Sequence, residues 1–153
     1  MQLVLPMSEF QTIDDVFDFA IFKEIESHKF YTQWASQVKK PSIRTMLEQL
    51  AEDEADHRKK IEAVRAGMAQ MEAGGIASLN IADYVDPIEP HPDMDYKDLL
   101  IVAMNKEKKS FKLYWDLTQT ATDAHLKELF QWLCRQEAEH KLQFELEYDL
   151  STF

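Results

Sequence analysis

Hydrophobic residues recur every three to four positions in four long stretches of the chain, the spacing that is typical of amphipathic α-helices. These stretches run from Ile13 to about Val38, from Pro41 to a stop at Gly74-Gly75, from Asp95 to about Ala121, and from Asp123 to about Asp149. Proline is concentrated between the second and third stretches, which predicts a long irregular connection there. The pattern therefore predicts an all-α protein of one domain over residues 1–153, an antiparallel four-helix bundle made of two hairpins.

The second pair of predicted helices repeats the first pair. Residues 20–62 align without a gap on residues 103–145, and 11 of the 43 paired positions are identical. Such self-similarity at a fixed offset is the mark of a duplicated structural unit. We therefore expect two similar helical hairpins related by a pseudo-two-fold axis.

Each predicted helix has one glutamate at the centre of its hydrophobic face. On a helical wheel these are Glu24, Glu54, Glu107 and Glu137, and apolar side chains flank each of them. A buried carboxylate without a partner is very unfavourable. Four inward-facing glutamates therefore predict a cationic partner in the core.

Two of these glutamates are followed by a histidine three positions later, which places both side chains on one helix face. Glu54 with His57 and Glu137 with His140 are the two Glu-x-x-His motifs of the chain, and they occupy equivalent positions of the repeat. One such motif usually marks a solvated, charged face. Two in register, together with the glutamates of the other helices, give four carboxylates and two imidazoles. This set suits two divalent cations and is the ligand pattern of di-iron and di-manganese bundles.

The pattern resembles the rubrerythrin branch of the ferritin-like superfamily, over residues from about 13 to 149. The resemblance implies a ferritin-like bundle with two iron ions per chain, which manganese or zinc can replace. It also implies a role for each ligand: terminal carboxylates at Glu24 and Glu107, bridging carboxylates at Glu54 and Glu137, and nitrogen ligands at His57 and His140. Tyr31 and Tyr114 match family tyrosines that hydrogen-bond these carboxylates.

The sequence departs from full-length rubrerythrin at two points. A rubredoxin module needs four cysteines, and the chain has only Cys134, so electrons must come from an external donor. Ser110 stands where an extra glutamate would lie one turn after the ligand of the third helix. The second departure makes the site more similar to the symmetric six-ligand centre of bacterioferritin.

Four further polar residues lie close to the predicted ligands, and each has two interpretations. His28 lies about 40° from Glu24 on the wheel and is either a partner of the ligands or an ordinary core histidine, which we favour. Asp53 and Gln136 each precede a bridging glutamate and either orient a ligand histidine or are ordinary boundary residues. Cys134 is aligned with Ala51 and is interpreted as a small core residue rather than a redox group.

Three phenylalanines of the first helix, Phe19, Phe22 and Phe30, lie on the side opposite its hydrophobic face. We therefore expect an exposed aromatic patch and, through it, a homodimer.

Charge and cysteine content exclude several classes of protein. There are 28 acidic and 17 basic residues, which give a net charge of −11 and disfavour sequence-independent binding of nucleic acid. No apolar run approaches the length of a membrane span. A single cysteine excludes disulfides within the chain, and the first residues lack the basic segment of a secretion signal. These features favour a cytoplasmic protein.

The favoured function is that of a di-iron oxidoreductase that reduces dioxygen or hydrogen peroxide, or oxidises ferrous iron, with external electrons. The alternatives are an iron-storage or metal-handling protein without turnover, a di-iron hydroxylase of an organic substrate, and a helical interaction protein with a relic site. Metal content together with the visible spectrum would separate them best.

Overall fold

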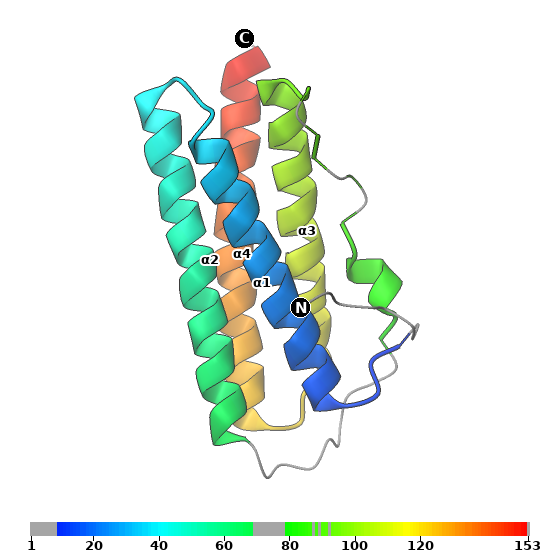
Figure 1. The fold of residues 1–153 in the computed structure, drawn as a ribbon. Coiled ribbons are helices and arrows are strands. Elements are labelled where there is room, and N and C mark those ends of the chain that lie inside the picture. Colours follow the sequence, from blue (N-terminus) through cyan, green and yellow to red (C-terminus); the bar gives the residue numbers. More distant parts are fainter. Residues whose placement is uncertain (1–8, 69–78, 87, 89, 92, 153) are drawn as a thin grey trace. The chain divides into compact units, whose positions relative to one another are not determined.

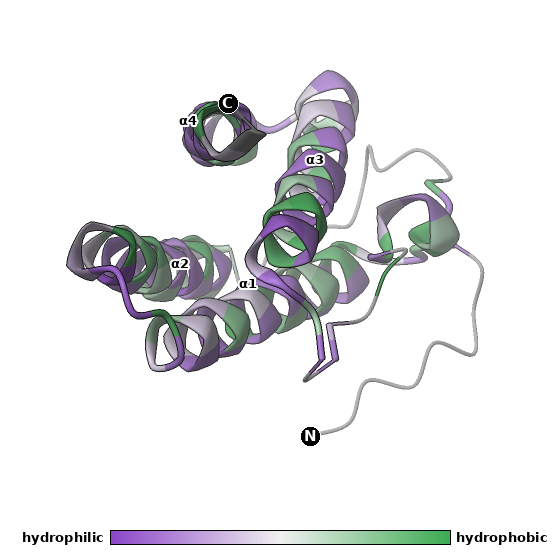
Figure 2. Ribbon diagram, turned by 90° about the horizontal axis from the view of Figure 1, so that it is seen from above, coloured by the Kyte–Doolittle hydropathy of each residue, from purple (hydrophilic) through white to green (hydrophobic). Residues whose placement is uncertain are grey.

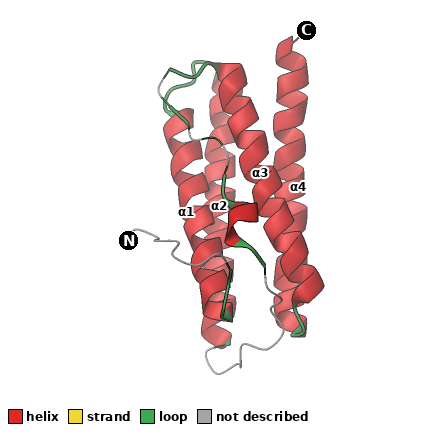
Figure 3. Ribbon diagram, turned by 90° about the vertical axis from the view of Figure 1, so that its right-hand side faces the viewer, coloured by secondary structure: helices red, strands yellow, loops and turns green. Residues whose placement is uncertain are grey.

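The computed structural model describes residues 9–68, 79–86, 88, 90, 91 and 93–152, which form four long helices and one short 3₁₀ helix (Figure 1). The elements are α1 (Ile13–Ala35), α2 (Pro41–Gly67), the 3₁₀ helix η1 (Ile81–Tyr84), α3 (Tyr96–Thr120) and α4 (Ala124–Thr152). The described residues contain no strand, only an isolated bridge between Glu9 and Asn80 (Figure 3). The expected all-α class is therefore confirmed.

The chain divides into two compact units, and each contains one helical hairpin. The first hairpin consists of α1 and α2, and the second consists of α3 and α4 with η1 packed on α3. This division follows the sequence repeat, because residues 20–62 lie in the first unit and residues 103–145 in the second. The assignment of residues 1–153 to a single domain stays a prediction.

All four helices begin within one residue of where the sequence predicts, and in three of them local side-chain bonds explain why. Thr12 and Asp15 form a capping box at the start of α1, in which each side chain bonds the backbone N–H of the other. Asp95 accepts a hydrogen bond from the Asp98 amide at 2.8 Å at the start of α3. Asp123 accepts one from the amide of Leu126 at 3.0 Å before α4. These bonds satisfy amides that have no partner inside the helix.

The second helix begins at Pro41, whose missing N–H causes no loss at the first position of a helix. Its described part ends at Gly67, and the predicted stop at Gly74-Gly75 lies outside the described residues. The first helix ends at Ala35, a few residues before the predicted end, and the fourth extends to Thr152. None of the helices described in the structure is long and apolar enough to cross a lipid bilayer.

In the first hairpin, α1 and α2 lie side by side and are joined by residues 36–40 (Figure 1). Both helices carry hydrophobic as well as polar residues along their length (Figure 2). Arg65 connects the end of α2 to the start of α1, because its guanidinium lies 2.8 Å from Asp18 and 3.2 Å from Asp14. The same guanidinium lies over the ring of Phe17, at 5.8 Å from its centroid.

In the second hairpin, residues 121–123 join α3 to α4, and the rings of Tyr114 and Phe130 stack with centroids 6.3 Å apart. The segment 81–86, which precedes α3 and contains η1, packs along this helix. Buried Tyr84 donates a hydrogen bond to Asp116 at 2.8 Å, and the ammonium of Lys112 bonds the same carboxylate at 3.0 Å. Two further lysines hold the segment. The Lys106 ammonium lies 2.9 Å from the Asp86 carboxylate, and the Lys109 ammonium donates to the backbone carbonyl of Asp83 at 3.1 Å.

The predicted exposed aromatic patch on α1 is wrong. Phe19 and Phe30 are buried, with 3% and 8% of their surfaces exposed, and Phe22 is half-buried. The ring of Phe10, which precedes the helix, packs on Phe19 with centroids 5.4 Å apart. A helical wheel contains only the residues of one helix and therefore cannot include a residue outside it, such as Phe10, that covers one of its faces.

Candidate metal centre

The first hairpin brings together three of the predicted ligands: Glu24 from α1, and Glu54 and His57 from α2. The three side chains each offer one donor atom, and these atoms lie within 4.8 Å of one another. The His57 Nδ1 atom is 3.4 Å from an oxygen of Glu24 and 3.7 Å from an oxygen of Glu54. Each of the three residues exposes no more than 2% of its surface. We call this group the first cluster.

The second hairpin contains the equivalent group, made of Glu107 from α3 with Glu137 and His140 from α4. Their donor atoms also lie within 4.8 Å of one another, and all three residues are buried. The His140 Nδ1 atom lies 3.6 Å from an oxygen of Glu107. We call this group the second cluster. The duplicated sequence has therefore produced the same constellation twice.

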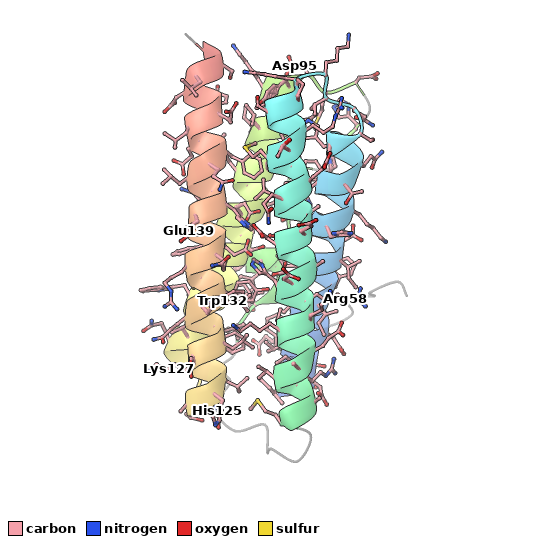
Figure 4. All side chains as sticks on the ribbon, turned by 90° about the vertical axis from the view of Figure 1, so that its left-hand side faces the viewer. Arg58, Asp95, His125, Lys127, Trp132 and Glu139 are labelled. Atoms are coloured by element: carbon pink, nitrogen blue, oxygen red, sulfur yellow. The ribbon has the colours of Figure 1, made fainter. Side chains whose placement is uncertain are left out.

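Helix geometry explains why the three side chains of a cluster meet. Residues three apart on a helix share a face, so the Glu-x-x-His motif of the second helix presents an oxygen and a nitrogen together. The neighbouring helix of the hairpin then adds its own inward-facing glutamate at the same level. Arg58, directly after the motif of α2, and Glu139, between the two ligands of α4, lie on other faces of these helices and are exposed (Figure 4).

The donor set and spacing of each cluster fit a divalent metal ion. Oxygen and nitrogen ligands lie about 2.0–2.2 Å from such an ion, so two donors of one ion are at most about 4.4 Å apart. The histidine–glutamate separations of 3.4, 3.6 and 3.7 Å satisfy that limit. Two buried carboxylates within one hairpin repel each other, and a bound cation removes this repulsion. Each cluster is therefore able to hold a metal ion.

The predicted tyrosines, Tyr31 and Tyr114, lie on the same helices as the first glutamate of each cluster, seven residues further along. Both are completely buried. Tyr31 packs against the ring of Phe30 with centroids 5.3 Å apart. Their hydrogen bonds to the carboxylates stay a prediction from the family resemblance.

Within each hairpin, a bond beside the cluster joins the two helices, and this bond differs between the hairpins. In the first hairpin, His28 Nδ1 lies 2.8 Å from the carbonyl oxygen of Ala51, and a carbonyl only accepts, so Nδ1 carries the hydrogen. In the second hairpin, the Cys134 thiol donates to the carbonyl of Phe111 at 3.7 Å. Positions 28 and 111 are equivalent in the repeat, as are positions 51 and 134.

Asp53 and Gln136 are half-buried beside Glu54 and Glu137. Asp53 accepts a hydrogen bond at 3.0 Å from the side chain of Gln49 on the same helix. Whether Asp53 or Gln136 also orients a ligand histidine stays a prediction. Cys134 is buried, which agrees with its interpretation as a small core residue.

Two buried lysines have no predicted role, although they are aligned in the repeat. Lys23 and Lys106 directly precede the first glutamate of each cluster and expose only 6% and 7% of their surfaces. The Lys106 ammonium is 2.9 Å from Asp86, and that of Lys23 lies 5.8 Å from the ring centroid of Phe19. Lysine is seldom buried, so its repetition beside a ligand was the only available signal.

Solved structures share this fold over most of the chain. A protein from Thermotoga maritima, described as a ferritin-like diiron-carboxylate protein, matches with a TM-score of 0.79 and 19% identity, covering 95% of this chain and 99% of its own. A hypothetical protein from Pyrococcus furiosus matches with a TM-score of 0.70 and 22% identity, covering 88% of this chain and 87% of its own. No curated protein matches the sequence.

The fold and the two clusters together define a class: ferritin-like helical proteins with buried glutamate and histidine clusters that are able to hold a metal ion, so the predicted fold class is confirmed. The family follows from the sequence. The sequence model of the rubrerythrin family matches residues 15–148, and the chain belongs to this family.

Proposed function

We propose that the protein is a di-iron oxidoreductase of rubrerythrin type. The observation that carries this proposal is the occurrence of the same buried Glu, Glu and His cluster in both hairpins of a rubrerythrin-family chain. In this proposal each cluster would hold one of two iron ions, and Glu54 and Glu137 would be the carboxylates to which the family resemblance gives the bridging role. Manganese or zinc can occupy the same donors according to supply.

Two ferrous ions, when bound, supply the two electrons that reduce an O–O bond, and their own oxidation releases these electrons. The chain's own residues bind the ions, hold the imidazoles in place and keep bulk water away from the buried carboxylates. The chain has no cysteine cluster for a second redox centre, since Cys134 is its single cysteine, so an external donor returns the electrons.

The experiment that tests this proposal combines metal analysis with a reaction. Purified protein is loaded anaerobically with ferrous iron, the metal per chain is measured, and the near-ultraviolet and visible spectrum is followed after addition of hydrogen peroxide or dioxygen. About two irons per chain and a new absorption band after oxidation are expected. If the protein binds iron but the bound iron is not oxidised faster than free ferrous ion, it is instead a metal-handling protein without turnover.

Two further features belong to the proposal. A cytoplasmic location fits the free, buried Cys134, because thiols stay reduced there. A homodimer stays a prediction, now without an exposed aromatic patch to support it. Sedimentation at micromolar concentration would show twice the chain mass of 17.9 kDa for a dimer, and a much larger mass for a storage cage.

A further inference from the structure

The bond between the two helices differs in strength between the hairpins, at equivalent positions of the repeat. In the first hairpin an imidazole N–H donates to the Ala51 carbonyl at 2.8 Å, and in the second a thiol donates to the Phe111 carbonyl at 3.7 Å. A thiol is a weak donor, whereas an N–H at 2.8 Å is a good one. Of these two bonds, the one that joins the helices of the first hairpin at this level is therefore the stronger.

This level is close to the clusters. His28 lies one turn after Glu24 on α1, and Ala51 lies one turn before Glu54 on α2. A bond between these two turns fixes how far α1 and α2 can slide or rotate against each other. The separation between the Glu24 carboxylate and the Glu54–His57 pair depends directly on that motion. The imidazole of His57 is within 3.4 and 3.7 Å of both glutamates, so the donors are already gathered.

We propose that the two clusters are unequal, and that the first cluster binds its metal ion more tightly and fills first, with His28 as the positioning residue. A ligand set that is held in place before binding loses less conformational freedom when the ion enters. At the equivalent place the second hairpin has the weaker thiol bond, so its helices restrain the gathered donors of the second cluster less firmly. This inference rests on the proposed function, because it divides the proposed centre into a tight and a weak position.

The test uses the full chain with one cluster disabled at a time. His140→Ala leaves the first cluster complete, and His57→Ala leaves the second complete. The tighter Zn²⁺ dissociation constant of each variant, measured by calorimetry with a competing chelator, therefore reports its complete cluster. We expect the His140→Ala variant to bind about three- to tenfold more tightly, the range that one net hydrogen bond provides. Equal constants, or tighter binding by His57→Ala, would overturn the inequality.

A second pair of variants assigns the difference to His28. In the His140→Ala background, His28→Phe should weaken Zn²⁺ binding by about three- to tenfold, whereas His28→Gln, which keeps an N–H donor, should bind like its parent. Phenylalanine is chosen because Phe111 occupies the equivalent position of the second hairpin. If His28 only supports the fold, His28→Phe will lower the melting temperature of the metal-free protein and leave the constant unchanged, which overturns its positioning role.

The two proposals fail in different ways. If the unaltered chain binds no Zn²⁺ and no Fe²⁺, the proposed function is wrong and this inference falls with it. If the chain binds two ions but the single-cluster variants have equal constants, only the inference is wrong.

Discussion

At the scale of single residues, the clusters are the main departure from an apolar core. Glutamate and histidine occupy positions that the helix pattern reserves for hydrophobic side chains, and each exposes at most 2% of its surface. Such burial lowers stability unless a bound ion or a proton compensates the buried charge. The duplication places the same set of polar residues in both hairpins, so these residues are not an isolated defect in the packing of one core.

The first prediction concerns the carboxylates that are proposed to bridge the two ions. Glu54→Gln or Glu137→Gln should remove more than half of the bound metal, because the carboxylate of each glutamate is expected to bind both ions. The matched controls are Glu52→Gln and Glu139→Gln, which are exposed on the same two helices. Full metal occupancy in either bridging variant, measured by atomic emission, would contradict the ligand assignment.

The second prediction concerns the buried thiol of the second hairpin. Burial raises the pKa of Cys134 from 9.0 to about 11, with a further increase from the charge of Glu137 and an opposing hydrogen bond from Thr118. Above pH 9 the unfolded chain loses this proton while the folded chain keeps it until about pH 11. The free energy of unfolding should therefore be unaffected below pH 9 and should fall as the pH rises from about 9 to about 11.

The measurement is urea unfolding between pH 8 and pH 10.5, with Cys134→Ala as the comparison. The unaltered protein should lose up to about 2 kcal/mol more than the variant over this range. Parallel pH profiles for the two proteins would show that the thiol titrates alike in both states.

At the scale of the elements, the first hairpin is fastened at its open end by a charged side chain. Arg65 near the end of α2 pairs with Asp14 and Asp18 in the first turns of α1, and it covers the ring of Phe17. Acidic residues near a helix start are also favoured by the helix dipole. One arginine thus holds the beginning of α1 and the end of α2 together.

We predict that Arg65→Met lowers the free energy of unfolding by about 1 kcal/mol, because two partly exposed ion pairs are lost together. The control is Arg58→Met, which removes an exposed pair with Glu62 on the same helix and should cost about half as much or less. The difference should shrink in 1 M salt, which screens exposed charges. A salt-independent loss would indicate that packing on Phe17, rather than charge, holds the two ends.

The segment before α3 provides the fourth prediction. Tyr84→Phe removes a buried hydrogen bond to Asp116 and should lower the free energy of unfolding by about 1 kcal/mol. Val85→Ala in the same segment is the control, since Val85 is exposed and should have almost no effect. Equal stability of the tyrosine variant and the unaltered protein would mean that Lys112 alone satisfies Asp116.

Much of this architecture could be predicted from the sequence. The helix starts at Thr12, Asp95 and Asp123 were readable because caps are local, and the cluster residues because helix spacing and duplication both point to them. The covering of Phe19 by Phe10 was not readable, because it depends on how the chain enters the helix. The packing of residues 81–86 on α3 depends on Tyr84 and three lysines whose partners are fixed only by the fold.

At the scale of the whole molecule, bound metal should contribute to stability by mass action. At a thousandfold excess over the dissociation constant the gain is about 4 kcal/mol, which corresponds to a melting temperature about ten degrees higher for a chain of this size. Melting of chelated and metal-loaded protein, followed by circular dichroism, measures the shift. The Glu54→Gln/Glu137→Gln double variant should show no shift, and a shift that persists in it would place the stabilising metal elsewhere.

The short connections within each hairpin have a consequence for how quickly the chain folds. Residues 36–40 join α1 to α2, and residues 121–123 join α3 to α4, so the partners within each hairpin are neighbours in sequence. Closing a short loop costs little entropy, and topologies rich in local contacts fold in microseconds to milliseconds. Each hairpin should therefore form early in refolding, before metal enters, so the speed of reaching the folded helical state should depend little on whether iron is present.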